Sequence, residues 1–207
     1  MTDAYAGKTR IYRAVIDRLN EPLQSIAFKT HPPERGMKVL DVGCGTGSQL
    51  VQYGAAGCSI TGVDLSPAML TEARTTLGKA TDLRLADATN LPFDAVTFDL
   101  VLISMMLHEL TPDIRIQVLA EVSRVLRSEG AVIVADFTAG PLTLKGRLIR
   151  AMSWGVERLA GADHFGEFRT FVKAGGLPAV ISGSRLRLDR ERPLAGGNVA
   201  VYVCRAV

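Results

Sequence analysis

An apolar segment that runs into three closely spaced glycines limits the possible folds of this chain more than any other feature. Residues 37–42 are mostly apolar, and Gly43, Gly45 and Gly47 follow them. This pattern predicts a short buried strand that ends where the backbone turns sharply. Glycines let a backbone approach a ligand closely, and the helix expected after the turn begins with unpaired N–H groups at the positive end of its dipole. The sequence therefore predicts a binding site for a polar ligand at this turn.

An acidic residue at the end of the next predicted strand narrows the choice of ligand. Asp64 lies 17 residues after Gly47, where dinucleotide-binding folds place the acid that binds ribose hydroxyls. A ligand with a ribose is therefore expected. The same two signals fit NAD or FAD, but the glycine spacing is G-x-G-x-G instead of G-x-G-x-x-G, and Asp87 adds a carboxylate after the third predicted strand. An NAD-linked oxidoreductase is thus the weaker alternative.

Strand and helix patterns alternate along most of the chain. Strands are predicted at residues 37–42, 59–63, 83–86, 98–103 and 131–136, and helices at 46–53, 67–77, 112–126, 142–159 and 164–174. Alternation predicts parallel strands joined by crossover helices, and strands without a polar face predict helices on both sides of the sheet. The last two predicted strands, 179–188 and 199–205, should pair as an antiparallel hairpin at the sheet edge. We therefore expect an α/β fold with a doubly wound, Rossmann-like sheet of seven strands, mostly parallel, with an antiparallel C-terminal hairpin strand.

Length and composition set further bounds. The chain has no internal repeat, linker or low-complexity segment, so residues 1–207 are expected to form a single domain that starts with one or two helices at residues 3–27. The net charge is only +3 and no block of basic residues occurs, so no nucleic-acid partner is expected. The three cysteines have no C-x-x-C spacing, which predicts neither a disulfide framework nor a metal site. Without an apolar run long enough for a signal or a membrane span, a soluble, cytoplasmic protein is expected.

Four segments in order carry a resemblance to a known family. Residues 39–47, 62–70, 85–93 and 98–110 resemble the successive motifs of class I S-adenosylmethionine-dependent methyltransferases. The resemblance covers residues 38–136 and is greatest to the small-molecule branch, which includes quinone-biosynthesis and phospholipid methyltransferases. It implies S-adenosyl-L-methionine as the cofactor and S-adenosyl-L-homocysteine as the product.

The resemblance assigns the glycine turn to the methionine and ribose part of the cofactor. Gly43, Gly45 and Gly47 would line that part, and Asp41 would fix the amino group of the cofactor. Cys44, between the glycines, is expected to be a small filler and not a nucleophile. A glycine cluster after a strand can also be no more than a turn.

The other motif residues would hold the nucleoside and the reacting end. The resemblance places Asp64 on the two ribose hydroxyls, although capping of the next helix is the alternative role for this residue. Leu65 would lie against the adenine face, Asp87 would bind the exocyclic amine, and the N–H of Ala88 would bind a ring nitrogen. Ser104, at the end of the fourth strand, would face the methionine end.

Sequence is less informative about the methyl acceptor. His108 and His164 are candidate general bases, with packing or helix-end roles as the alternatives. The helical insertion at residues 142–174 lies where the family builds its acceptor pocket, and Tyr5 and Tyr12 in the leading helices are candidates for a lid.

The predicted function is methyl transfer to a small organic acceptor by direct in-line displacement, because an activated sulfonium methyl needs mainly alignment in a dry pocket. Residues 142–159 mix apolar and basic side chains, so a peripheral-membrane enzyme that acts on a quinone or phospholipid is one alternative. A cofactor-binding module without catalysis is another. The sequence leaves open the methylated atom and the choice between monomer and homodimer.

Overall fold

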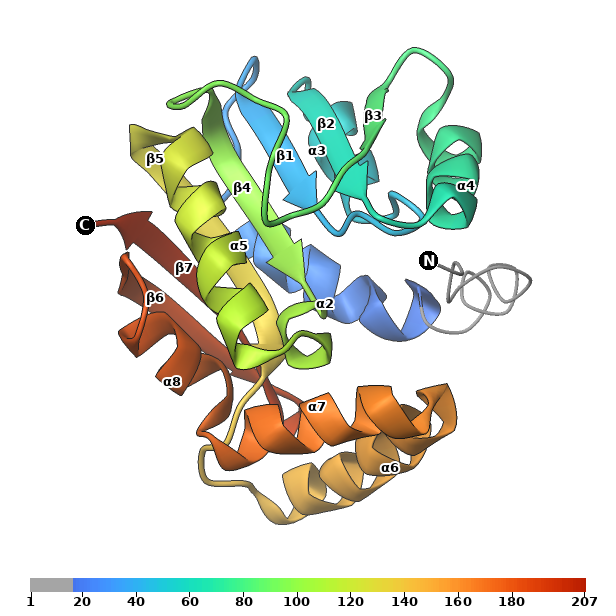
Figure 1. Ribbon diagram of the computed structural model, residues 1–207, viewed down its shortest axis with the longest axis vertical. Coiled ribbons are helices and arrows are strands. Elements are labelled where there is room, and N and C mark those ends of the chain that lie inside the picture. Colours follow the sequence, from blue (N-terminus) through green and yellow to red (C-terminus); the bar gives the residue numbers. More distant parts are fainter. Residues whose placement is uncertain (1–16) are drawn as a thin grey trace.

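A seven-stranded sheet forms the centre of the computed structural model, which describes residues 17–207 (Figure 1). The strands are β1 (Lys38–Val42), β2 (Ser59–Asp64), β3 (Asp82–Leu85), β4 (Phe98–Ser104), β5 (Leu126–Phe137), β6 (Leu186–Leu194) and β7 (Val199–Ala206). They lie in the order β3-β2-β1-β4-β5-β7-β6. The first five are parallel, and β7 runs antiparallel to both β5 and β6. The predicted mostly parallel sheet with an antiparallel hairpin is therefore confirmed.

The order of the strands fixes where a ligand can bind. The chain passes from β1 outward to β2 and β3, and then returns to the other side of β1 to form β4 and β5. In doubly wound sheets the crevice for a ligand opens at the carboxyl ends of the two strands where the order reverses. Here those strands are β1 and β4, and the glycine turn follows β1 directly.

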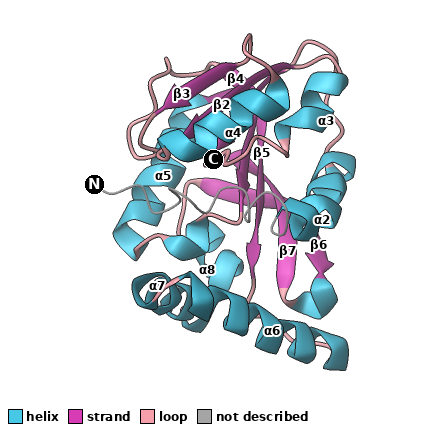
Figure 2. Cartoon of the chain, turned by 90° about the vertical axis from the view of Figure 1, so that its right-hand side faces the viewer, coloured by secondary structure: helices cyan, strands magenta, loops and turns pink. Residues whose placement is uncertain are grey.

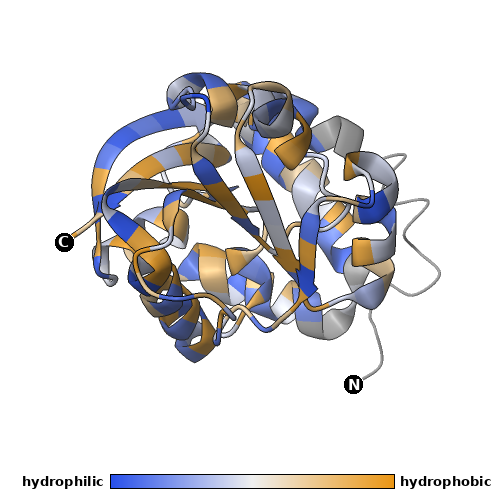
Figure 3. Cartoon of the chain, turned by 90° about the horizontal axis from the view of Figure 1, so that it is seen from above, coloured by the Kyte–Doolittle hydropathy of each residue, from blue (hydrophilic) through white to orange (hydrophobic). Residues whose placement is uncertain are grey.

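Helices cover both faces of the sheet (Figure 2). They are α2 (Asp17–Thr30), α3 (Leu50–Ala55), α4 (Pro67–Leu77), α5 (Pro112–Val125), α6 (Leu144–Ala160), α7 (Ala162–Lys173) and α8 (Gly176–Ser182), with short 3-10 turns η2 (Leu107–Glu109) and η3 (Ala195–Gly197). Side chains alternate along β4: Val101 and Ile103 join α5, α7 and α8 in one apolar core, while Leu100 and Leu102 join α2, α3 and α4 in the other. Hydrophobic segments of the strands accordingly lie between the helices in Figure 3. Both faces are buried, as the apolar strands predicted.

Three predicted elements differ from the structure, and one of them is the strand predicted at 131–136, which begins at Leu126 as β5. Residues 179–182, predicted as the start of a strand, belong to α8, and β6 begins only at Leu186. Leu177 and Ile181, four residues apart, are buried on one side of α8, so tertiary packing decided the structure of this short apolar run. The helix predicted at 46–53 begins only at Leu50, because the glycine turn continues through Gly47, which has a φ of +74°. Tyr5, Tyr12 and the first part of the predicted leading helices lie outside the described residues.

Helices α6 and α7 lie side by side at the carboxyl end of β4 and β5, where Figures 1 and 2 both show them. Thr143 begins α6 by accepting a hydrogen bond from the N–H of Gly146 at 3.0 Å. Arg150 ties α6 to the hairpin turn, because its guanidinium donates to the side chain of Asn198 at 2.9 Å. The predicted insertion at 142–174 is thus a helical pair that covers one end of the sheet. No helix within the described residues is long and apolar enough to cross a membrane.

Candidate functional site

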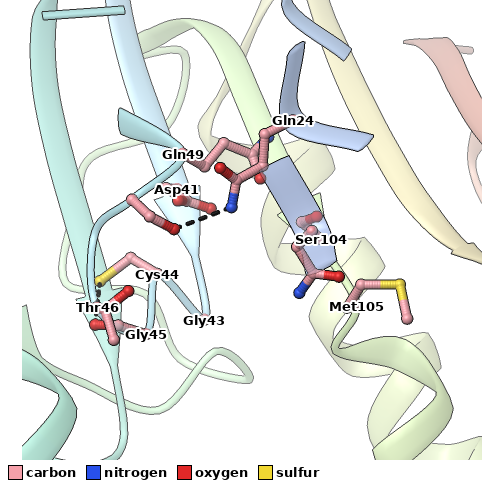
Figure 4. A pocket seen from close by; sticks show the side chains of 11 residues that line it. Gln24, Asp41, Gly43, Cys44, Gly45, Thr46, Gln49, Ser104 and Met105 are labelled. Carbon is pink, nitrogen blue, oxygen red and sulfur yellow. Dashed lines mark hydrogen bonds between the residues drawn. The ribbon is translucent and has the colours of Figure 1, made fainter. Parts of the chain in front are cut away.

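A pocket opens where the glycine turn, α2 and the end of β4 meet (Figure 4). The residues that line it are Asn20, Gln24, Asp41, Gly43, Cys44, Gly45, Thr46, Ser48, Gln49, Ser104 and Met105. Across the pocket, the Gln24 side chain donates a hydrogen bond to Ser48 Oγ at 2.9 Å. The structure therefore brings five predicted site residues together at this pocket, and they are Asp41, Gly43, Cys44, Gly45 and Ser104, whereas Gly47 does not line it. The pocket also has polar side chains from α2 that the sequence did not indicate.

The three glycines of the turn serve different purposes. All have positive φ angles, of +71° at Gly43, +52° at Gly45 and +74° at Gly47, a region that L-residues with a side chain rarely adopt. A Cβ on Gly43 would lie 2.5 Å from Met106 Sδ, and one on Gly47 would lie 2.6 Å from Leu77 Cδ1. A Cβ on Gly45 would have no neighbour within 4 Å. Gly43 and Gly47 therefore permit close packing of the protein, whereas Gly45 leaves open space for a ligand.

Asp64 connects the end of β2 to the glycine turn. Its Oδ2 accepts a hydrogen bond from the N–H of Gly45 at 2.8 Å, and its Oδ1 accepts one from the N–H of Ser66 at 2.8 Å. Capping of the next helix was the alternative role predicted for Asp64. Ser66 caps α4 instead, because its Oγ accepts a hydrogen bond from the N–H of Met69 at 3.1 Å. Asp64 thus holds the shape of the site from the position predicted for the ribose acid.

Asp41 places a buried carboxyl group at the floor of the pocket. Its side chain is almost fully buried, with 2% of the residue exposed. Burial, followed by the nearby negative charge of Asp64, raises the pKa of this carboxyl group to about 8. Because its surroundings disfavour the negative charge, the carboxyl group of Asp41 would be stabilised in its ionised form by a nearby cation. The pocket therefore fits a ligand with a positively charged group.

Exposed apolar side chains lie near the predicted acidic residues Asp64 and Asp87 at the ends of β2 and β3. Leu65 is 57% exposed and Leu85 is 60% exposed, which suits a platform for a flat ring. Asp87 is exposed, and its Oδ1 accepts hydrogen bonds from both the N–H and the Oγ1 of Thr89 at 2.8 Å. Ala88 lies half-buried beside it. The predicted nucleoside residues thus lie at the carboxyl ends of neighbouring strands.

Cys44 packs against the sheet. A Cβ on Gly62 would lie 2.8 Å from Cys44 Sγ, so the thiol fills the space that this glycine leaves. Burial raises the pKa of the thiol well above its ordinary value, and a protonated thiol is a poor nucleophile. These observations support the role of a small filler.

His108 and His164, the candidate bases, lie together with Glu157 between them. Nδ1 of His108 is 2.8 Å from Asp136 Oδ1, and its Nε2 is 3.7 Å from Glu157 Oε2. Nε2 of His164 is 2.5 Å from the same oxygen of Glu157. We call His108, Asp136, Glu157 and His164 the histidine cluster. Its two acidic members were missed by the sequence analysis. Asp136 could have been noticed as an acid at the end of a predicted strand, whereas nothing in the spacing pointed to Glu157.

The histidine cluster is electrostatically coupled. Burial alone would lower the pKa of His108, but the charge and hydrogen bond of Asp136, together with Glu157, outweigh it and raise the pKa to about 10. Burial alone would raise the pKa of Glu157, but its bonds to both histidines lower it to about 2. The hydrogen bond to Glu157 also raises the pKa of His164. His108 is therefore protonated at neutral pH in this arrangement, and a protonated imidazole cannot accept a proton.

Aromatic rings surround the histidine cluster. Phe168 of α7 lies 4.9 Å from the ring of Phe137 and 5.7 Å from that of Trp154, measured between ring centroids, and Phe165 lies 5.8 Å from Trp154. His108 itself lies 5.0 Å from Phe137. The rings meet edge to face, the arrangement that aromatic pairs favour. The helical pair therefore packs aromatic side chains onto the ends of β4 and β5.

Comparison with known proteins identifies relatives across most of the chain. Residues 40–134 match a family described as Methyltransferase domain. The chain is similar to a demethylmenaquinone methyltransferase of Beutenbergia cavernae, with 34% identity over 93% of this chain and 82% of that protein. It is also similar to an uncharacterized methyltransferase of Synechocystis sp., with 36% identity over 56% of this chain and 51% of that protein. The chain spans about half the length of the first curated relatives it matches.

The solved structures show the same fold. A TehB-like S-adenosylmethionine-dependent methyltransferase from Corynebacterium glutamicum superimposes with a TM-score of 0.64, covering 98% of this chain and 100% of that one. The two sequences are 20% identical, so this likeness concerns the fold alone. The Rossmann-like arrangement is thus shared.

Proposed function

Because the chain belongs to the class I S-adenosylmethionine-dependent methyltransferases, we propose that it methylates a small organic acceptor held between the glycine-turn pocket and the helical pair α6–α7. The observation that carries this proposal is the position of the pair. It covers the carboxyl ends of β4 and β5 with aromatic side chains, and Ser104 at the end of β4 lines the pocket. An apolar cover beside the cofactor pocket suits an organic acceptor.

The buried acid of the pocket and the open space over Gly45 support this cofactor. S-adenosylmethionine carries an ammonium and a sulfonium, and the buried Asp41 carboxyl group is stabilised as a carboxylate by such cations. The open space over Gly45 admits the ligand. We assign the methionine and ribose part to Asp41, Gly43 and Gly45, which line the pocket, with Cys44 as a filler beside them and Gly47 as the residue that shapes the turn.

The remaining assignments concern the nucleoside and the methyl-bearing end. Asp64 would bind the ribose hydroxyls while it holds the N–H of Gly45. Leu65 would contact the adenine face through its exposed side chain, with Asp87 and Ala88 on the polar edge of the base. Ser104 would face the methionine end, where it lines the pocket.

When bound, the cofactor supplies a methyl group that is already activated on a sulfonium. The protein then has to exclude water and align the acceptor, and alignment can contribute about 7–11 kcal/mol to lowering a barrier. The aromatic side chains of α6 and α7 would exclude water from the reacting end. The catalytic role of His108 and His164 stays a prediction, because both rings are bonded to carboxylates of the protein.

The test of this proposal is a calorimetric titration of the protein with S-adenosylmethionine, S-adenosylhomocysteine and NAD. It is followed by incubation with methyl-labelled cofactor and a panel of amines, phenols, quinones and lipids. We expect binding of the first two ligands and label in one class of small acceptor. Binding of NAD alone would overturn the cofactor assignment, and label in no small molecule would overturn the acceptor assignment.

One observation favours a second candidate, a peripheral-membrane enzyme that acts on a quinone or phospholipid. Four apolar side chains spaced four residues apart form an exposed row on α6, and they are Leu144, Leu148, Met152 and Val156. Lys145, Arg147 and Arg158 are exposed on the same helix. Apolar residues flanked by basic ones are the composition of helices that lie on anionic lipid. The acceptor would then reach the pocket from the lipid surface.

A further inference from the structure

Three potential metal ligands from three separate elements converge in the histidine cluster. His108 lies on η2, Glu157 on α6 and His164 on α7. One ligand atom of each lies within 4.8 Å of the other two. Two imidazole nitrogens and one carboxylate oxygen form the set of protein ligands that Zn²⁺ has in many catalytic sites. The convergence depends on the docking of α6 and α7, so the sequence spacing gave no sign of it and predicted no metal site.

The orientation of His108 also fits a metal ligand. An ionised carboxylate can only accept hydrogen bonds, so the bond of 2.8 Å between Asp136 Oδ1 and His108 Nδ1 places a proton on Nδ1. Nε2 then faces Glu157, and it is the nitrogen that would release its proton to bind an ion. The backbone N–H of His108 donates to the other oxygen of Asp136 at 3.2 Å, which fixes the pair further. Metal-binding histidines usually have such a carboxylate on the second ring nitrogen.

Spacing and charge support the same conclusion. With bonds of about 2.0–2.2 Å, the ligand atoms of tetrahedral zinc lie roughly 3.4 Å apart. The Glu157 oxygen is 3.7 Å from His108 Nε2 and 2.5 Å from His164 Nε2, so Glu157 and His164 would move apart by about 1 Å around an ion. Among the described side chains, no lysine or arginine forms an ion pair with Asp136 or Glu157. One divalent cation would balance both carboxylates with neutral imidazoles.

We propose that His108, Glu157 and His164 bind a divalent transition-metal ion, with Zn²⁺ as the best fit, and that Asp136 orients His108. Three protein ligands leave a fourth position on a tetrahedral ion. The side chains of Glu157 and His164 are 13% and 20% exposed, so the ion would enter from their side. The site is separate from the glycine-turn pocket and goes beyond the proposed methyl transfer.

The test uses the full chain, freed of metal with a chelator, and calorimetric titration with ZnCl₂. We expect one equivalent to bind saturably. Glu157→Gln and His164→Gln should each weaken binding by at least tenfold, because each removes a ligand with little change in volume. His31→Gln is the matched control, since His31 lies outside the cluster, and it should bind as the unaltered chain does.

Two further measurements make the result decisive. Circular dichroism and thermal unfolding establish that each variant is folded, and His164, partly exposed, is the substitution least able to disturb the core. Titration of the same samples with S-adenosylmethionine tests the cofactor pocket independently, so failure of the metal site and failure of the proposed function are distinguishable. Absence of saturable Zn²⁺ binding, or equal binding by the folded Glu157→Gln and His164→Gln variants, would overturn the proposal.

Discussion

The Oδ2 atom of Asp64 lies 2.8 Å from the backbone nitrogen of Gly45, so a side chain at the end of β2 fixes the turn that follows β1. The residue predicted to bind ribose therefore also shapes the loop that we propose contacts the cofactor. This double role makes Asp64 the most sensitive position of the proposed cofactor site.

Replacement of this carboxylate should abolish most of the cofactor affinity. Asp64→Ala removes the acceptor for Gly45 and the proposed bonds to two ribose hydroxyls. Hydrogen bonds to charged groups contribute about 1.5–3 kcal/mol each. We therefore expect S-adenosylmethionine to bind at least about 100-fold more weakly in calorimetry, since about 1.4 kcal/mol corresponds to a factor of ten. Asp94→Ala, at an exposed acid outside the pocket, should leave affinity unchanged. Equal affinity of Asp64→Ala and the unaltered chain would contradict the assignment.

A matched pair of glycines separates backbone strain from ligand contact. Gly36 and Gly45 both have positive φ, of +87° and +52°, and a Cβ on either would have no neighbour within 4 Å. Each substitution by alanine should therefore lower the free energy of unfolding by about 1 kcal/mol through strain alone. Gly45→Ala should in addition weaken S-adenosylmethionine binding by tenfold or more, and Gly36→Ala should not. Urea denaturation and calorimetry measure the two effects. Similar cofactor affinity in both variants would show that no ligand approaches Gly45.

The buried carboxyl group of Asp41 predicts a pH dependence of stability. Its pKa is raised from 3.8 to about 8 by burial and by Asp64, so the folded state holds a proton that the unfolded state releases. This contribution to stability is fully present below pH 4 and is lost as the pH rises through 8. Between pH 5 and 8 the loss is on the order of 3 kcal/mol. The side chain of Asp41→Asn cannot titrate. The free energy of unfolding of this variant, measured by urea denaturation, should therefore fall correspondingly less between pH 5 and pH 8. Parallel losses in both proteins would show that Asp41 is ionised when folded.

The sequence predicted the geometry of the glycine turn better than that of the histidine cluster, for a physical reason. The structure around Gly43, Gly45 and Asp64 is encoded in short segments of sequence. A turn that requires positive φ and an acid at the end of a strand can each be recognised from a few neighbouring residues. The boundary of α8 and the partners of His108 depend on segments distant in the chain. Pairing of Glu157 with both histidines requires α6 and α7 to dock on the end of β4, and no local pattern encodes that contact.

The exposed apolar row of α6 leads to a prediction about lipid. Leu148 and Met152 are 66% and 65% exposed, and full burial of such side chains contributes about 1.5–3 kcal/mol each. If α6 lies on a bilayer, Leu148→Ser combined with Met152→Ser should weaken sedimentation with phosphatidylglycerol vesicles by about tenfold or more. The matched control is Ile114→Ser combined with Ile116→Ser, which removes two exposed apolar side chains from α5.

Charge gives the same experiment a second readout. Basic residues near an anionic surface contribute about 1 kcal/mol each, and salt screens this attraction. Binding should therefore weaken as salt is added, and it should be weaker on vesicles of phosphatidylcholine alone. Two outcomes would leave a small acceptor from aqueous solution as the substrate class. One is equal vesicle binding by the α5 and α6 variants, and the other is no binding of the unaltered chain to anionic vesicles. Loss confined to the α6 variant would instead favour an acceptor that resides in the membrane, because the helix proposed to hold the acceptor would then also contact the lipid surface.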